Sequence, residues 1–212
     1  MAEGSHTTSS RGTGAARERT LRAQGRKTRQ RLADAALRVF AARGYHQARV
    51  DDIVRAARTS HGTFYLYFAN KEDLLQQLAA DCAAALEALA GAVPDIGPDA
   101  DGEAALRTYL ESFVDTYGRY GVVIRAWMER QVTDRTVDRL GVQAFTHIAQ
   151  ALAQRLAAVG APHDPETVAA LMAMLERTTY AMTSRDLALD RAGALDTLAA
   201  VVHRGFFVSG AA

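Results

Sequence analysis

The chain has 212 residues, of which 49% are hydrophobic and 23% charged, the balance of an ordinary folded protein with room for one or two compact domains. Every apolar run is shorter than the roughly 18 residues that cross a bilayer, and the N-terminus lacks the apolar stretch of a secretory signal. This composition argues against a membrane-spanning or secreted chain, and we expect a cytoplasmic protein with no membrane partner.

Charge is distributed unevenly along the sequence. Residues 1–31 hold eight basic side chains against two acidic ones, a net charge of +6, so the rest of the chain carries −5. A basic end suits a polyanion, while the polar composition of residues 1–24 predicts a disordered tail. The tail can be disordered in the free protein and still bind DNA if it becomes ordered on phosphates or in a minor groove.

Four prolines fall in two short loops, and the proline-free stretches between them are rich in good helix formers, which predicts an all-α fold. Ser60, Asn70 and Asp164 each stand directly before an apolar periodic stretch, where they would cap a helix. The predicted helices are 27–43, 50–57, 61–67, 71–91, two or three over 103–133 broken near Gly118 and Gly121, 136–159, 165–185 and 191–208.

The most informative stretch is residues 44–75, GYHQARVDDIVRAARTSHGTFYLYFANKEDLL. A short amphipathic helix, a three-residue turn and a second short helix form a helix-turn-helix, although this spacing also occurs in purely structural hairpins. The outer face of the second helix carries hydrogen-bonding side chains and no acidic one, and Gly62 allows close approach to a surface. Such a face suits the major groove of double-stranded DNA. The hydrogen-bonding residues are Ser60, His61, Thr63, Tyr65 and Tyr67.

The same stretch resembles the TetR family of transcriptional regulators over about 45 residues, through G-Y, V-D-D-I, A-A, S-x-G-T-F-Y-x-Y-F and N-K-E-D-L-L. The resemblance implies that His61, Gly62 and Thr63 face bases. It also implies that Tyr65, Tyr67 and Lys71 hold the phosphate backbone, while a structural role for the two tyrosines, with one packed in part against the first helix, remains an alternative. The implied architecture is a three-helix head and a five- to six-helix body, about nine helices, with a tail over 1–24, a DNA-binding domain over 25–70 and a ligand-binding and dimerisation domain over 71–212.

Two residues depart from the family pattern. Arg58 stands where glycine is usual in the turn, so either the turn differs or an arginine tolerates it. Arg49 stands where Ser or Thr usually caps the second helix, a cap of about 1 kcal/mol. We interpret Arg49 as an added phosphate contact, with Asp51 and Asp52 partly replacing the cap at the positive end of the helix dipole.

Residues 103–185 are rich in aromatic and methionine side chains, and Tyr109 and the aromatic residues at 113, 117 and 120 share one helical face. Plain core packing remains an alternative for each of them. The family resemblance implies an effector pocket here, and a core rich in Tyr and Met is typical of ligand cavities. The predicted pocket residues are Leu106, Tyr109, Leu110, Phe113, Tyr117, Trp127, Phe145, Met172, Leu175 and Tyr180.

The last 45 residues contain LMAMLERTTYAM at 171–182 and LDTLAAVVHRGFFV at 195–208. These stretches are similar to the ethionamide-resistance regulator subgroup of the family, whose pocket is a long, mainly apolar tunnel. In that register Met172 and Leu175 replace polar amides, which predicts a more apolar pocket for a small apolar or amphiphilic effector. The family forms homodimers through its last two helices, which would place two recognition helices one DNA turn apart. The predicted interface residues are Leu171, Leu195, Leu198, Val202 and Phe206.

Signatures of catalysis are missing from the sequence: no two of the six histidines are three or four residues apart, and no HExxH, GxSxG or nucleotide-binding glycine motif occurs. We expect no enzyme, no cofactor and no metal, and we expect Cys82 to act as a small buried apolar residue. The predicted function is a repressor released from a pseudo-palindromic operator by its ligand. A ligand-independent, nucleoid-associated factor and an activator remain alternatives.

Overall fold

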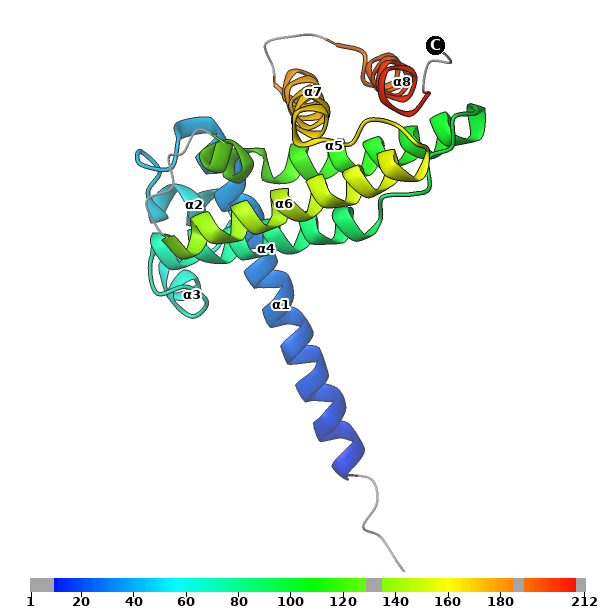
Figure 1. Cartoon of the computed structure of the whole chain (residues 1–212). Coiled ribbons are helices and arrows are strands. Elements are labelled where there is room, and N and C mark those ends of the chain that lie inside the picture. Colours follow the sequence, from blue (N-terminus) through cyan, green and yellow to red (C-terminus); the bar gives the residue numbers. More distant parts are fainter. Residues whose placement is uncertain (1–9, 129–134, 185–188, 209–212) are drawn as a thin grey trace, which may run out of the picture. The chain divides into compact units, whose positions relative to one another are not determined.

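The computed structural model describes residues 10–128, 135–184 and 189–208. All regular secondary structure in these residues is helical, which confirms the predicted all-α fold class (Figure 1). The three predicted caps are present: the side chains of Ser60, Asn70 and Asp164 accept hydrogen bonds from the first turns of their helices. The helices are α1 Ser10–Arg43, α2 Val50–Ala56, α3 His61–Tyr65, α4 Lys71–Gly91, α5 Ala100–Met128, α6 Arg135–Ala158, α7 Pro165–Thr183 and α8 Arg191–Val202, followed by a π-helical turn His203–Phe207.

The chain divides into two compact units, Met1–Leu74 and Leu75–Ala212. In the first unit, α2 packs against the C-terminal part of α1 and α3 follows α2 after a short turn. Leu32 and Phe40 of α1, Ile53 of α2 and Phe64 of α3 are at most 1% exposed and form its core. The small α2–α3 hairpin is therefore held on α1 by buried apolar side chains, which contribute about 1.5–3 kcal/mol each.

Helix α1 starts at Ser10, well before the predicted start near Lys27, so the prediction of a disordered tail over 1–24 is wrong for residues 10–24. Once the part of α1 that packs in the core has nucleated the helix, each further residue adds one hydrogen bond for one residue ordered. The added segment, SRGTGAARERTLRAQGR, is rich in Ala and Arg and extends the helix despite three glycines. Residues 1–9 of the predicted tail lie outside the described residues.

Helix α5 is a single helix of 29 residues in the second unit, so the predicted breaks near Gly118 and Gly121 are wrong. A glycine inside a helix weakens it by only about 1 kcal/mol, which packing readily offsets. Gly121 is buried, and a Cβ there would lie 3.4 Å from the ring of Tyr117 and 3.2 Å from the Arg125 guanidinium. These glycines permit close packing and do not end the helix.

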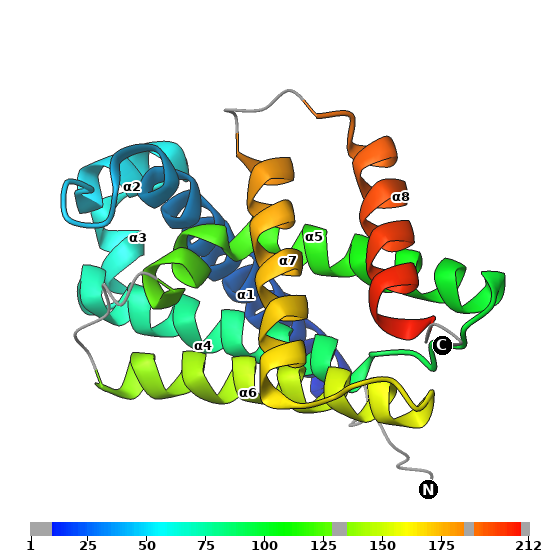
Figure 2. The same ribbon diagram turned by 45° about the horizontal axis from the view of Figure 1, so that its top comes forward.

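Helices α7 and α8 run antiparallel beside each other, and both pack on α5 (Figure 2). Ion pairs tie α8 to α5 at two places: Arg107 Nε lies 2.6 Å from Asp196 Oδ1, and Arg191 Nη2 lies 2.5 Å from Asp115 Oδ1. The predicted extents of α6, α7 and the final helix are confirmed to within about two residues, except that the final helix ends in the π-helical turn.

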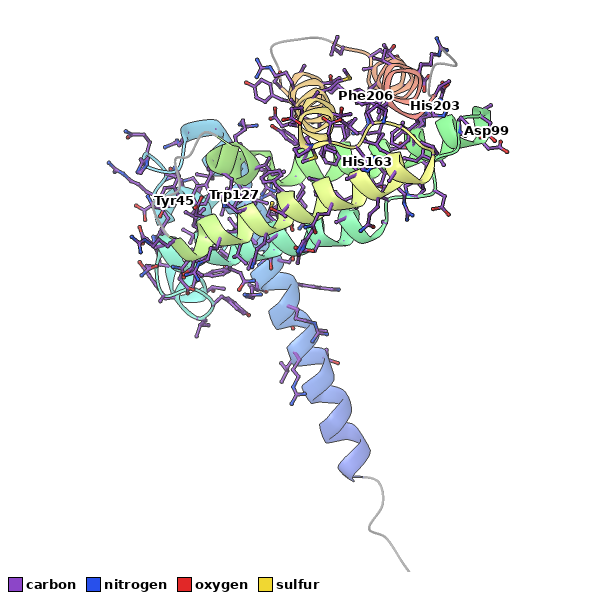
Figure 3. All side chains as sticks on the ribbon, in the orientation of Figure 1. Tyr45, Asp99, Trp127, His163, His203 and Phe206 are labelled. Carbon is purple, nitrogen blue, oxygen red and sulfur yellow. The ribbon has the colours of Figure 1, made fainter. Side chains whose placement is uncertain are left out.

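A buried histidine, His203, joins the C-terminal end of the second unit to the loop before α5 (Figure 3). His203, which is 3% exposed, has Nε2 2.7 Å from the carbonyl oxygen of Gly97 and Nδ1 3.7 Å from Glu103. The π-helical turn is thereby fastened to the loop before α5. Among the helices that the structure describes, none is both long and apolar enough to cross a membrane.

Candidate functional site

The start of α2 is fixed by a carboxylate and not by the residue at the cap position. The Arg49 side chain has no acceptor to offer, whereas Asp52 Oδ2 accepts the Arg49 backbone N–H at 3.2 Å. The Arg43 guanidinium lies 3.2 Å from the other oxygen of Asp52. Asp52 therefore takes over part of the missing cap, as predicted, and the exposed Arg49 side chain remains available to solvent.

The turn between α2 and α3 keeps the geometry that glycine usually supplies. Arg58 has φ +52°, in the left-handed region, and its N–H donates to the carbonyl of Arg55 at 3.1 Å. The N–H of Thr59 donates to the carbonyl of Val54 at 3.0 Å, which completes a Schellman motif. The turn is thus unchanged in geometry, and Arg58 tolerates it at a cost of about 1–2 kcal/mol.

Helix α3 is short and held by one buried ring. Phe64 is 0% exposed, and its ring lies 5.7 Å from that of Phe68 and 5.3 Å from that of Tyr65. At the start of the helix, the N–H of Thr63 donates to Ser60 Oγ at 3.1 Å, and the two hydroxyl oxygens are 2.9 Å apart. The hydroxyls of the two residues are therefore already bonded to each other.

The exposed face of α3 carries most of the residues predicted to meet DNA. His61, Gly62 and Tyr65 are exposed, the last at 57%, whereas Tyr67 is half-buried beside Gly25 of α1. Tyr65 is therefore the more accessible of the two tyrosines. Leu66, which no sequence pattern singles out, is 80% exposed at the end of α3, where an apolar group could meet a thymine methyl.

A second residue missed by the sequence analysis bonds directly to this face. Asp51 Oδ1 on α2 lies 2.5 Å from His61 Nε2 on α3, and both side chains are more than half exposed. A surface hollow of about 490 Å³ adjoins Asp51 and is lined also by Arg43, Gln47, Arg49, Asp52 and Arg55. Three arginines and two aspartates line this hollow, and Asp52 Oδ1 lies 3.2 Å from Arg43 Nη1 and 3.9 Å from Arg55 Nη1.

The ammonium of Lys71, which is predicted to hold a phosphate, is bonded to the backbone of the first unit. Lys71 Nζ donates to the carbonyl oxygens of Tyr45 and Ala48, at 3.0 and 3.1 Å, and lies 4.4 Å from the centre of the Tyr45 ring. These carbonyls belong to the loop between α1 and α2, so Lys71 fastens this loop to the start of α4. Burial, followed by the charge of Glu72, raises the pKa of Tyr45 to about 12, which keeps this hydroxyl a donor to Glu72.

The residues predicted to line a ligand pocket lie inside the second unit. Seven of the ten are at most 6% exposed, and Phe145, Met172 and Tyr180 are half-buried. Tyr117 Oη donates to Glu176 at 2.7 Å, and burial, followed by this carboxylate, raises the Tyr117 pKa well above its ordinary value. The buried hydroxyls of Tyr109 and Thr179, by contrast, have no hydrogen-bond partner among the residues described.

Four of the five residues predicted for the dimer interface are buried by their own chain: Leu171, Leu195, Leu198 and Val202 are at most 4% exposed. Their assignment to an interface is therefore wrong, because their apolar faces pack on the inside of the second unit. Phe206, in the π-helical turn, is half-buried (Figure 3). The outward faces carry other residues: Ala170, Ala173 and Arg177 on α7, and Thr197, Val201 and Arg204 along α8 and the turn after it.

Cys82 is fully buried, as predicted, and burial raises its pKa above the ordinary value, which keeps the thiol protonated. The described residues hold no group of three His, Cys, Asp or Glu side chains placed to bind a metal ion.

A helix-turn-helix with a polar recognition face, followed by an α-helical second unit, defines a DNA-binding transcriptional regulator of the TetR type. Residues 32–78 match the family model described as "Bacterial regulatory proteins, tetR family". The regulator EthR of Mycobacterium tuberculosis is 31% identical over 164 residues, which cover 70% of this chain and 73% of EthR. The chain belongs to the TetR family.

Other relatives match a shorter segment or share only the fold. The fatty acid metabolism regulator protein of Bacillus subtilis is 47% identical over 55 residues, which cover 26% of this chain but only 28% of that regulator. The crystal structure of FadR from Bacillus subtilis in complex with stearoyl-CoA has a TM-score of 0.58 at 19% identity, covering 86% of this chain and 99% of that one. A TetR-family protein from Rhodococcus RHA1 has a TM-score of 0.63, also at 19% identity, covering 85% and 97%.

Proposed function

We propose that this chain is a homodimeric repressor that binds a pseudo-palindromic operator and leaves it when a small amphiphilic ligand enters the second unit. The observation that carries the proposal is the polar face of α3, exposed on one side and anchored by the buried Phe64 on the other. Membership of a family of bacterial regulatory proteins supports the same assignment. The cytoplasm is the matching location for such a protein.

The contacts proposed with DNA are of two kinds, contacts with base edges and contacts with phosphates. His61, Gly62 and Thr63 lie at the start of α3, where a recognition helix meets base edges. Arg49 and Tyr65 are exposed beside them and would contact phosphates, with Tyr67 as a weaker contact because it is half-buried. Lys71 would contribute indirectly, because it fixes the loop that carries Arg49. Ser60 would contribute by capping α3.

The class of ligand is inferred from the polar groups that the second unit leaves without partners. A buried hydroxyl without a hydrogen bond costs about 1–3 kcal/mol, and Tyr109 and Thr179 each carry one. The buried core to which both belong consists largely of apolar and aromatic side chains. A ligand with an apolar chain and a polar group that bonds a hydroxyl would relieve this cost. FadR of Bacillus subtilis has been crystallised with stearoyl-CoA, a molecule of this class.

The dimer interface that we propose replaces the one predicted from sequence. Small side chains at 170 and 173 on α7 are exposed, as are Thr197 and Val201 on α8, and the two helices run antiparallel (Figure 2). Helices of a second copy could pack closely on such small side chains. Arg177 and Arg204 lie on the same outward faces and would form a polar rim.

Release of DNA would follow from a shift between two populations of the dimer. In one population the two DNA-binding units fit successive major grooves, and in the other they do not. A ligand that binds the second population more tightly lowers the affinity for the operator, by the same factor by which the operator lowers the affinity for the ligand. Helix α4 contains the boundary between the two units, at Leu74 and Leu75, so it is the covalent element through which such a change would pass.

DNA binding is tested by fluorescence anisotropy with the duplex that lies upstream of the protein's own gene, over a series of salt concentrations. We expect tight binding, a steep salt dependence and at least a tenfold loss in His61→Ala. Gln154→Ala, an exposed change on α6 of the second unit, is the control and should leave binding unchanged. Equal, weak binding to every duplex would favour the nucleoid-associated alternative, and no binding at low salt would refute the proposal.

Ligand release is tested on the same complex with stearoyl-CoA and with palmitate as probes. We expect release at ligand concentrations that also raise the melting temperature of the free protein, since a ligand at one hundred times its Kd stabilises by about 2.7 kcal/mol. A specific complex that persists with both probes contradicts a repressor released by acyl ligands. It would leave the activator and ligand-independent alternatives.

The dimer is tested by sedimentation equilibrium, where we expect twice the chain mass of 22.9 kDa. Ala173→Glu places a carboxylate on the outward face of α7 and should shift the protein to monomer, while Ala157→Glu, on the exposed side of α6, should not. A monomer mass that does not depend on concentration would refute the dimer.

A further inference from the structure

The hydrogen bond between Asp51 and His61 joins the two helices of the helix-turn-helix at its outer surface. Asp51 Oδ1 lies 2.5 Å from His61 Nε2, and the two side chains are 63% and 54% exposed. His61 is the first residue of α3, and Asp51 belongs to the first turn of α2. A side chain proposed to read DNA thus has one of its two ring nitrogens already engaged by the protein.

The chemistry of this bond determines what the rest of the ring can do. An ionised carboxylate only accepts hydrogen bonds, so Nε2 must carry the proton that it donates. In the neutral ring the other nitrogen, Nδ1, is then an acceptor without a hydrogen. Across the parts of the chain that the structure describes, no group bonds to Nδ1. The bond to Asp51 therefore leaves His61 with one free acceptor.

Base edges in the major groove distinguish between an acceptor and a donor. Adenine N6 and cytosine N4 offer donors there, whereas guanine O6 and N7 and thymine O4 accept. A neutral histidine with a free choice of tautomer can satisfy either kind of edge. One whose tautomer is fixed by the protein favours the bases that carry an amino group.

We propose that Asp51 is a positioning residue for base recognition: it fixes the tautomer of His61, so that this side chain selects adenine or cytosine at one position of each operator half-site. The inference rests on the proposed DNA-binding function and adds to it the class of base that is read. Asp51 would contact no base itself. It acts through the ring that it holds.

The neighbouring groups leave Asp51 free for this role. Asp52, the next carboxylate, is occupied by the Arg49 N–H and by the Arg43 guanidinium. The backbone that carries His61 is fixed on both sides, since the Schellman turn precedes it and the Ser60 cap holds the first turn of α3. Because neither helix end can shift easily, the orientation of the ring depends on the Asp51 bond.

The tautomer is measured first, on the free full-length protein, by nitrogen-15 NMR of the histidine rings at pH 9, well above the ordinary histidine pKa of about 6.5. Signals of His61 are assigned by their loss in His61→Gln. We expect a single Nε2–H tautomer in the unaltered protein and in Asp51→Glu, which keeps a carboxylate. Asp51→Ala should give a mixture of tautomers. A mixture in the unaltered protein, or no change in Asp51→Ala, would overturn the proposal.

Base preference is then measured at the same pH with duplexes in which each base pair of the operator half-site is varied in turn. The unaltered protein should prefer adenine or cytosine roughly fivefold at one position, the effect of one hydrogen bond. Asp51→Ala should lose this preference at that position alone, Asp51→Glu should keep it, and Asp51→Ala should add nothing in a His61→Ala background.

The tautomer and the base preference together separate base selection from a structural effect of Asp51. A change in affinity that is equal at all positions, with no preference lost, would mean that Asp51 has only a structural or charge effect, and the proposal fails. Absence of binding to any duplex would refute the proposed function and base selection together, while the NMR result would still decide whether Asp51 fixes the ring.

Discussion

The two units of this protein hold their candidate functional groups in opposite ways. In the first unit the polar groups lie on the surface and are already bonded to each other, as in His61 with Asp51 and Ser60 with Thr63. In the second unit the buried hydroxyls of Tyr109 and Thr179 have no hydrogen-bond partner within the part of the chain that the structure describes. Side chains that are already fixed on the surface lose little conformational entropy when they bind a partner. Buried hydroxyls without a hydrogen bond gain free energy when a ligand supplies one.

The largest effect is expected from removing the ring on which the first unit is built. Phe64→Ala should lower the free energy of unfolding of that unit by about 3–5 kcal/mol, because Phe64 is 0% exposed and is in contact with two other rings. Urea unfolding followed by circular dichroism measures the loss, and operator binding should disappear with it. The neighbouring Tyr65→Ala, at an exposed ring, should stay within about 0.5 kcal/mol. Equal losses in the two variants would show that α3 is not anchored by Phe64.

A comparable test of the second unit uses a glycine at a helix crossing. A Cβ at Gly141 of α6 would lie 2.6 Å from ring atoms of Trp127 on α5, so Gly141→Ala should destabilise by about 1–3 kcal/mol through overpacking. Thermal melting should fall by roughly 2–4 °C for each kcal/mol. Gly91→Ala, where no atom lies within 4 Å, is the control and should not lower the melting temperature. An unchanged melting temperature in Gly141→Ala would mean that the crossing adjusts without strain.

Lys71→Met distinguishes a structural from a DNA-contacting cation. The loss of two hydrogen bonds to the carbonyls of Tyr45 and Ala48 should reduce stability by about 1–2 kcal/mol. Because the ammonium faces the loop, the salt dependence of operator binding should keep its slope. Arg49→Met should do the reverse, leaving stability unchanged and lowering the slope by about 0.9. A lower slope in Lys71→Met would restore the phosphate contact predicted from sequence.

The smallest expected effect is a gain. Arg58→Gly removes the Cβ from a residue at φ +52° and should stabilise the first unit by about 0.5–1 kcal/mol, after the greater freedom of glycine in the unfolded chain is subtracted. The shift is read as a higher urea midpoint. Arg58→Ala, which removes the charge but keeps the Cβ, should show no gain. If both variants are stabilised alike, charge repulsion and not backbone strain is the cause.

Local signals in the sequence predicted the helices well. A cap such as Ser60 or Asp164 bonds within its own first turn, so its role depends only on residues three positions away. The glycines of α5 were misread because their meaning depends on distant neighbours. Whether a glycine breaks a helix or allows a close approach is decided by the side chain that faces it, such as Tyr117 at Gly121.

The site was predicted only in part, for the same reason. Apolar periodicity indicated that Leu195 and Leu198 are buried, but it could not indicate whether their own chain or a second copy covers them. The polar face of α3 followed from the pattern of one helix. The bond between Asp51 and His61 did not, since it joins residues ten apart on two helices whose crossing only the fold determines.

The close approach of Gly141 to Trp127 has an optical consequence. Trp127 is the single tryptophan of the chain, it is 6% exposed, and its indole N–H donates to the carbonyl of Val137 at 2.9 Å. A tryptophan in such a dry, hydrogen-bonded position emits at shorter wavelength than one in water. With excitation selective for tryptophan, the emission therefore comes from the second unit alone. Ligand entry or melting there should shift the emission wavelength, while events confined to the first unit should leave it unchanged.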